Sequence, residues 1–166
     1  MTERIFIALG ANLDERRLQL ERGLELLART PGLDIVARSP WFETEPVGGP
    51  IGQGRYLNGV AELATDLAPA ALLARLLEIE RLVGRDRSTE ERFGPRRLDL
   101  DLLLYGDRAL DEPGLVVPHP RLEERIFVLA PLAALAPELR LPSGCTVQER
   151  LAERLAAAAE PSLGTP

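Results

Sequence analysis

Two aspartates, Asp99 and Asp101, stand in the segment "RRLDLDLLLYGD" at residues 96–107. Its alternating start and apolar end predict a β-strand from Leu98 to Tyr105, with both carboxylates on one face of the sheet and about 6.5 Å apart along the strand. Asp is unfavourable in strands, and like charges on one face repel each other unless something neutralises them. Such a pair can hold Mg²⁺, which takes one or two carboxylates together with waters and substrate phosphates. The alternative is an ordinary solvated strand face.

The residues before this strand are rich in arginine. The chain has no lysine, so all 20 of its basic residues are arginine, which excludes a Walker-type phosphate loop and a Schiff-base lysine. Arginine binds phosphate oxygens in pairs through its planar guanidinium. Cations beside a carboxylate pair are what triphosphate binding and phosphoryl transfer require, although a solvated basic loop is the alternative. The arginines within residues 81–97 are Arg81, Arg85, Arg87, Arg92, Arg96 and Arg97.

Length and composition predict one domain over residues 1–160, followed by a disordered tail at 161–166. A chain of 166 residues with 45% hydrophobic residues can bury one sizeable core. The net charge of -6 disfavours a nucleic-acid partner. The single cysteine, Cys145, excludes an internal disulfide, and the apolar stretches are too short to span a bilayer. We therefore expect a cytoplasmic protein with no membrane partner.

The hydrophobic periodicity predicts the order β-α-β-β-α-β, followed by further helices. This order is typical of an α+β fold of the ferredoxin-like type, with a βαββαβ core, an antiparallel sheet and extra C-terminal helices. Asp66 is expected to cap the second helix, with Pro69 in its first turn. The glycine-rich segment 45–55 is expected to form a long loop. The expected strands span 4–10, 33–44, 56–65 and 98–105, and the expected helices span 14–29, 68–83, 121–135 and 147–159.

Several stretches of the chain resemble the 6-hydroxymethyl-7,8-dihydropterin pyrophosphokinase family. The segment "RFGPRRLDLDLLLYGD" is similar to the signature of that family, and "IALGANL", "SPWFETEPVG", "YLNGV", "IERLVGR" and "VPHPRLEERIFVLAPLAALAPEL" occur in the same order. The resemblance covers most of residues 4 to 140. It implies a ferredoxin-like α+β fold and an ATP-dependent diphosphotransferase of folate biosynthesis. The implied substrates are ATP and 6-hydroxymethyl-7,8-dihydropterin, the products are the dihydropterin diphosphate and AMP, and the implied cofactor is two Mg²⁺ ions.

The same resemblance implies a role for individual residues. Asp99 and Asp101 match the Mg²⁺ ligands, while Arg85 and Arg96 match the arginines that stabilise the transferred charge. Asn12 matches a supporting polar position near the pterin loop. The implied ATP-binding residues are Glu80, Arg85, Arg87, Arg96, Leu102, His119 and Arg125. The implied pterin-binding residues are Thr44, Val47, Tyr56, Asn58, Phe93 and Phe127, with the ring held between the two phenylalanines.

Two other classes of protein fit parts of this pattern. A Mg²⁺-dependent phosphohydrolase that uses the same Asp pair would release phosphate or pyrophosphate without needing a pterin. A non-catalytic ferredoxin-like ligand-binding module would show no turnover, and the arginines placed just before the Asp pair argue against it. Formation of AMP from ATP in the presence of the pterin distinguishes the three.

Overall fold

The computed structural model describes residues 3–13, 15–85, 88, 92 and 94–159. An antiparallel sheet in the order β2-β4-β1-β5 forms its centre, and β3 pairs with β4 beyond the end of β2. This is the expected βαββαβ arrangement with extra helices at the C-terminal side. The elements are β1 (Ile5–Ala11), α1 (Arg16–Ala28), β2 (Leu33–Arg38), β3 (Phe42–Thr44), β4 (Tyr56–Thr65), α2 (Pro69–Leu82), β5 (Asp99–Tyr105), β6 (Leu110–Glu112), β7 (Leu115–Val117), α3 (Ile126–Leu135) and α4 (Val147–Ala159).

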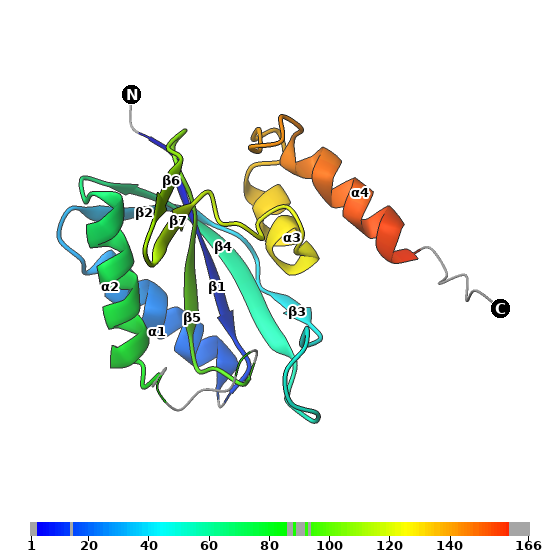
Figure 1. Ribbon diagram of the computed structural model, residues 1–166. Coiled ribbons are helices and arrows are strands. Elements are labelled where there is room, and N and C mark those ends of the chain that lie inside the picture. The colour runs from blue at the N-terminus through cyan, green and yellow to red at the C-terminus, as the bar shows by residue number, and fades with distance from the viewer. Residues whose placement is uncertain (1–2, 14, 86–87, 89–91, 93, 160–166) are drawn as a thin grey trace.

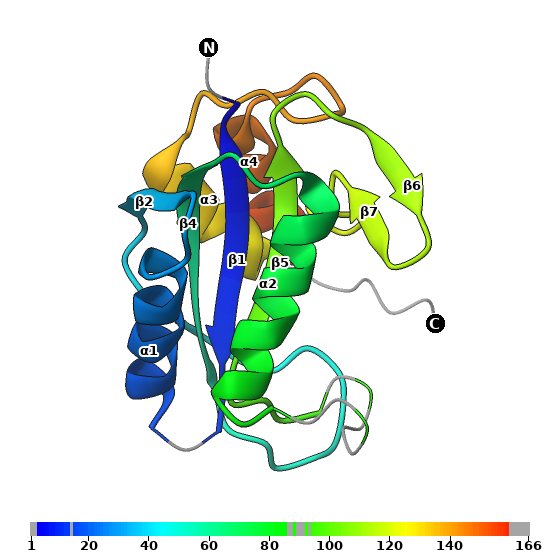
Figure 2. The same ribbon diagram turned by 90° about the vertical axis from the view of Figure 1, so that its left-hand side faces the viewer.

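The sheet is covered on both faces by helices. Helices α1 and α2 pack on one face, and α3, followed by α4, lies on the other (Figures 1 and 2). Successive side chains of a strand point to opposite faces, so β1 contributes to both sides of the core. Ile5 and Ile7 belong to the apolar cluster under α1 and α2, which we call the first cluster. Phe6 belongs to the cluster under α3 and α4, which we call the second cluster.

The structure corrects two of the expected helix starts. Helix α2 begins at Pro69 with Ala68 as its N-cap and no side-chain cap, so Asp66 does not cap it. Helix α3 begins at Ile126, whereas the periodicity predicted a helix from residue 121. Residues 121–124 form a turn instead, and Arg125 has an extended backbone with φ −102° and ψ 108°.

The cause of the late start of α3 is the packing of Leu122. Its side chain is buried in the second cluster, while its backbone N–H closes a turn by donating to the carbonyl of His119 at 3.1 Å. The backbone of His119 is in turn bonded to Leu103 of β5 at 2.9 Å. These contacts hold residues 119–125 against the sheet.

None of the helices in the described part of the chain combines the length and the apolar composition that a membrane span requires.

Candidate active site

Polar residues from three strands meet at one end of the sheet. Strand β1 ends there, and because the sheet is antiparallel, its neighbours β4 and β5 begin there. In the strand register, Gly10 lies between Asn58 on β4 and Asp99 on β5, while Ala8 lies opposite Asp101. Side chains that share this register share one face of the sheet.

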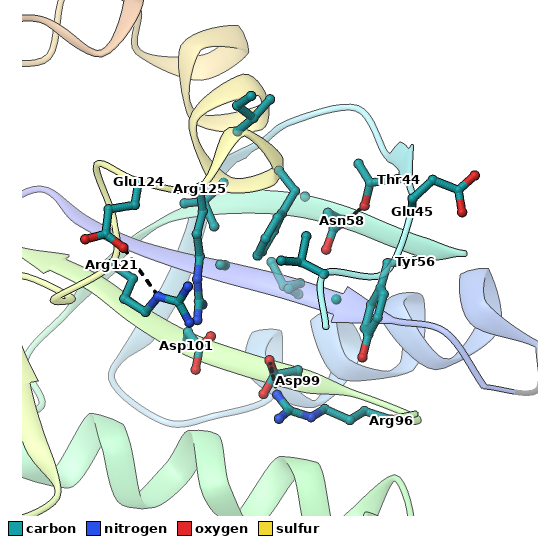
Figure 3. A pocket seen from close by; sticks show the side chains of 18 residues that line it. Thr44, Glu45, Tyr56, Asn58, Arg96, Asp99, Asp101, Arg121, Glu124 and Arg125 are labelled. Carbon is teal, nitrogen blue, oxygen red and sulfur yellow. Dashed lines mark hydrogen bonds and ion pairs between the residues drawn. The ribbon is translucent and has the colours of Figure 1, made fainter. Parts of the chain in front are cut away.

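Small residues in β1 leave room over this face. A Cβ atom on Gly10 would lie 3.0 Å from Oδ1 of Asn58, which is closer than an ordinary contact. Ala8 and Gly10 both line a cavity of about 300 Å³, which is bounded on its other side by the start of α3 (Figure 3). Strand β1 therefore forms the base of the cavity, and the longer side chains of its neighbours β4 and β5 form part of the cavity wall.

The cavity brings together residues from distant parts of the sequence. Arg121 and Glu124, which also line it, were not identified from the sequence, because the predicted helix over 121–135 concealed their place in a turn. Glu45 also lines the cavity and was likewise not identified from the sequence. The predicted site residues that line the cavity are Thr44, Val47, Tyr56, Asn58, Arg96, Asp99, Asp101, Arg125 and Phe127.

Asp99 is held between two arginines. Nη1 of Arg85 lies 2.6 Å from its Oδ1, and Nη1 of Arg96 lies 3.0 Å from its Oδ2. Arg96 lines the cavity, whereas Arg85 lies behind the strand with only 2% of its side chain exposed. The two arginines therefore neutralise one carboxylate, with one guanidinium at each of its oxygens.

Glu80 completes this buried arrangement. One of its oxygens, Oε1, lies 2.9 Å from Nη1 of Arg85 and accepts the backbone N–H of Leu100 at 2.9 Å. Its side chain is 1% exposed, so it forms a paired buried charge that ties α2 to β5. Glu80, Arg85 and Leu102 do not line the cavity, and the side chain of Leu102 is buried in the first cluster.

Asp101 has a different environment. It forms no hydrogen bond or ion pair with any of the residues that the structure describes. Burial, reinforced by the charge of Asp99, raises the pKa of Asp101 to about 7. A nearby cation would favour its ionised form.

The two carboxylates fit a hard divalent cation that is completed by other ligands. In the part of the chain that the structure describes, no three or more His, Cys, Asp or Glu residues form a group that could hold a metal ion by themselves. Mg²⁺ needs no such group, because waters and substrate phosphates commonly fill most of its octahedral shell.

At one end of the cavity, amide and hydroxyl groups come together. Nδ2 of Asn58 donates to Oγ1 of Thr44 at 2.5 Å, and the hydroxyl of Tyr56 donates to the carbonyl of Gly94 at 3.1 Å. Val47 lies on the exposed loop after β3. Phe127 reaches the cavity from α3 and adjoins both ends, because the guanidinium of Arg125 lies near its ring. The predicted residues Phe93 and Arg87 lie outside the described residues.

At the other end, Arg121 and Arg125 line the cavity, whereas the predicted residue His119 does not. The guanidinium of Arg125 lies 5.5 Å from the centre of the Phe127 ring, and burial together with the charge of Arg121 lowers the pKa of Arg125. Burial and the charge of Arg125 also lower the pKa of His119. Nδ1 of His119 accepts the backbone N–H of Arg121 at 3.1 Å, so the proton of the neutral ring is on Nε2.

Asn12 joins two of the segments around the site. Its Nδ2 donates to Oε1 of Gln53 and to the carbonyl of Gly54, both at 3.1 Å, and its Oδ1 accepts the backbone N–H of Arg96 at 2.8 Å. Only 6% of Asn12 is exposed. One buried amide therefore connects the glycine-rich loop with the segment before β5.

Comparison with known proteins finds relatives over nearly the whole chain. The model of the 7,8-dihydro-6-hydroxymethylpterin-pyrophosphokinase (HPPK) family matches residues 6–137. The chain is 49% identical over 152 residues to a 2-amino-4-hydroxy-6-hydroxymethyldihydropteridine pyrophosphokinase of Pseudomonas aeruginosa, which covers 92% of each chain. It is 40% identical over 134 residues to the protein of the same name from Bacillus subtilis, covering 81% of this chain and 78% of that one.

Solved structures share the fold at much lower identity. Wild-type Plasmodium falciparum HPPK-DHPS with pteroate matches with a TM-score of 0.73 and 13% identity, over 94% of this chain and 45% of that one. An HPPK-DHPS in complex with substrates matches with a TM-score of 0.74 and 12% identity, over 98% of this chain and 45% of that one. This chain thus spans less than half of those longer chains, and the likeness establishes the ferredoxin-like fold. Together with the sequence matches, it shows that the chain belongs to the 7,8-dihydro-6-hydroxymethylpterin-pyrophosphokinase family.

Proposed function

We propose that this chain transfers the β,γ-diphosphate of ATP to the hydroxymethyl group of 6-hydroxymethyl-7,8-dihydropterin, forming the dihydropterin diphosphate and AMP in folate biosynthesis. The observation that carries this proposal is a single cavity with a different chemical character at each end. Asn58, Thr44 and Tyr56 stand at one end, Arg125 and Asp101 stand at the other, and Asp99 lies between the two ends (Figure 3). A flat heterocycle suits the first end, and a polyphosphate suits the second.

The pterin would bind at the amide end. Asn58 offers both a donor and an acceptor for the edge of a heterocycle, and its bond to Thr44 fixes its orientation. Phe127 offers an aromatic face from α3. Stacking on Phe93 from the opposite side is part of the same proposal.

The triphosphate would lie over Asp99 and Asp101, with its oxygens reaching Arg96, Arg125 and His119. These two aspartates would hold two Mg²⁺ ions, which when bound supply charge neutralisation and alignment for the phosphate oxygens. Arg96 already touches Asp99, so its guanidinium is in place to stabilise charge as it moves onto the leaving oxygen. Arg85 fixes Asp99 from behind. Arg87 belongs to the proposed nucleotide side as well. Glu80 and Leu102 do not line the cavity, so Glu80 would act through Arg85 and Leu102 would support β5 from the opposite face of the sheet.

The reaction balances without a covalent enzyme intermediate. The hydroxymethyl oxygen attacks the β-phosphorus of ATP, and the bond from that phosphorus to the oxygen bridging to the α-phosphate breaks. AMP leaves with the bridging oxygen, and the hydroxyl proton passes to water. A loose transition state of this kind asks the protein mainly for alignment and electrostatic stabilisation.

The test is an assay of AMP formation. We expect the protein with ATP, Mg²⁺ and 6-hydroxymethyl-7,8-dihydropterin to form one AMP for each pterin diphosphate, and to release no phosphate or pyrophosphate when the pterin is left out. Release of phosphate or pyrophosphate without pterin would identify a phosphohydrolase. Binding of ATP and pterin without any turnover would identify a binding module.

Domain organisation and location belong to the same proposal. Residues 1–160 would act as one pyrophosphokinase domain, because both apolar clusters share the same sheet. The unpaired Cys145 suits the reducing conditions of the cytoplasm. Limited proteolysis and cell fractionation would test these two points.

A further inference from the structure

Arg121 lines the cavity but has no role in the function proposed above. It lines the cavity together with Arg125 and Asp101, at the end opposite to Thr44 and Tyr56 (Figure 3). Its side chain comes from the turn before α3. A residue at this place is beside the proposed triphosphate and remote from the proposed pterin.

The backbone that carries Arg121 is firmly held. The N–H of Arg121 donates to Nδ1 of His119 at 3.1 Å, and the next residue, Leu122, is only 1% exposed. The backbone of His119 is itself bonded to β5. The side chain of Arg121, by contrast, is 44% exposed. A fixed Cα with an adjustable guanidinium is well suited to bind an anion that enters from solvent.

The positively charged groups around Arg121 lie close together, and a bound anion would compensate their charges. The pKa of Arg125 is lowered by burial and, after burial, by the charge of Arg121, so the two guanidinium groups lie close enough to repel each other. The charge of Arg121 also acts on His119, where burial and Arg125 are the larger causes of a lowered pKa. An anion between these groups would turn their repulsion into a shared attraction.

The contact between Arg121 and Glu124 is weak. Nε of Arg121 lies 3.4 Å from Oε2 of Glu124, near the upper limit for a hydrogen bond, and 56% of the Glu124 side chain is exposed. Exposed ion pairs of this kind contribute little to stability. A phosphate offers more charge and a bidentate geometry, so it can displace the carboxylate.

We propose that Arg121 binds the polyphosphate of the nucleotide at the end of the cavity opposite to the pterin, and that Glu124 holds Arg121 beside the cavity until the nucleotide displaces it. This inference rests on the proposed function, since it assumes that a nucleoside triphosphate occupies the cavity. It adds a residue pair that the family resemblance did not assign. Arg121 is then a nucleotide-binding residue, and Glu124 is a positioning residue that competes with the phosphate.

The test compares Arg121→Ala, Glu124→Gln and a matched control, Arg29→Ala. Arg29 is also an exposed arginine in a pair with a glutamate, Glu25 at 2.6 Å, but it follows the C-terminal end of α1 and does not line the cavity. The dissociation constant of α,β-methylene-ATP with Mg²⁺ is measured by calorimetry at several salt concentrations. Steady-state kinetics give kcat and KM for each substrate.

We expect Arg121→Ala to weaken binding of the analogue about 10-fold and to reduce the salt dependence of binding, because one charge-assisted contact is lost. The KM for ATP should rise while the KM for the pterin stays unchanged. Glu124→Gln should strengthen binding about 3-fold, because the competing charge is removed. Arg29→Ala should leave all of these values as they are.

Equal dissociation constants for Arg121→Ala and Arg29→Ala would overturn the phosphate contact. Unchanged or weaker binding in Glu124→Gln would overturn the competition by Glu124. The unaltered protein is assayed for AMP formation in the same series. Failure there would refute the proposed function, whereas the binding comparison needs no turnover and decides the inference separately.

Discussion

Asp99 and Asp101 share a strand face, yet their surroundings give them different chemical properties. Asp99 touches Arg85 and Arg96, so its negative charge is compensated by the protein itself. Asp101 has no such contact with the described residues, and burial raises its pKa to about 7. In the free protein, Asp101 therefore lacks the direct arginine contacts that compensate the charge of Asp99.

This difference predicts a pH-dependent effect of Asp101→Asn on the metal-free protein. Because the pKa of Asp101 is raised in the folded state, the folded protein keeps a proton that the unfolded chain has released. The stability contributed by Asp101 therefore falls as the pH rises from 3.8, the ordinary pKa of an aspartate, through about 7. Asp101→Asn should therefore gain stability over the parent, and the gain should grow by about 2 kcal/mol between about pH 5 and about pH 8.

Urea unfolding followed by the fluorescence of Trp41, the only tryptophan in the chain, measures this gain in the presence of a chelator. The exposed Asp107, in the turn after β5, supplies the control Asp107→Asn. A gain that is the same at both pH values would show that Asp101 is ionised throughout this range.

Arg96 is expected to act mainly in the transition state. Its contact with Asp99 places the guanidinium at the cavity, and the loss of a preorganised charge there costs about 10³-fold in turnover. Arg96→Ala should lower kcat by that amount with a small change in both KM values, and Arg96→Lys should recover part of it. The control is Arg97→Ala, since the neighbouring Arg97 is exposed and does not line the cavity. Similar kcat values for Arg96→Ala and Arg97→Ala would rule out this role.

At the level of elements, the site depends on segments that meet at one end of the sheet. The end of β1 and the start of β5 are joined by backbone bonds from Asn12 and Leu13 to the carbonyl of Arg96, at 3.0 and 3.3 Å. The side chain of Asn12 then extends this link to the glycine-rich loop through Gln53 and Gly54. The order of the loop and the position of Arg96 are therefore coupled through one residue.

Asn12→Ala should loosen this coupling. The variant loses three hydrogen bonds of a buried amide, which costs about 1–3 kcal/mol of stability. We also expect faster hydrogen exchange over residues 48–54 and a higher KM for the pterin. Thr30→Ala is the control, because Thr30 is about equally buried and hydrogen-bonded but lies beyond the opposite end of α1. If both variants leave loop exchange unchanged, Asn12 does not order the loop.

At the level of the whole molecule, the two apolar clusters have different relations to the cavity. The first cluster, under α1 and α2, supports the sheet from the face opposite to the cavity. The second cluster holds α3, whose first turn supplies Phe127 to the cavity wall. We therefore expect packing in the second cluster to affect the width of the cavity more directly than packing in the first.

Substitutions of two fully buried leucines, one in each cluster, distinguish the effects of the two clusters on the cavity. Leu132→Ala in α3 and Leu72→Ala in α2 should each cost about 2–5 kcal/mol in urea unfolding, because each leaves a cavity in a well-packed cluster. Below the unfolding transition, Leu132→Ala alone should weaken the binding of the ATP analogue with pterin. Equal losses of affinity would mean that the two faces of the sheet are coupled.

Local patterns in the sequence were sufficient for much of this organisation. The alternation around Asp99 and Asp101 placed both on one strand face, and the order of the strands and helices led to the observed antiparallel sheet. The residue types and motifs also identified the family. These features depend on the period of a strand or a helix and on short-range spacing, which are properties of neighbouring residues.

Tertiary structure alone decided which charges face the cavity. Arg85 and Arg96 look alike in the sequence, but Arg85 is buried behind β5 with Glu80, while Arg96 lines the cavity. Arg121 and Glu124 reach the cavity because the burial of Leu122 replaces an expected helical turn with a bent segment. Burial and convergence depend on contacts between residues far apart in the chain, and the free energy of those contacts outweighs local helix propensity.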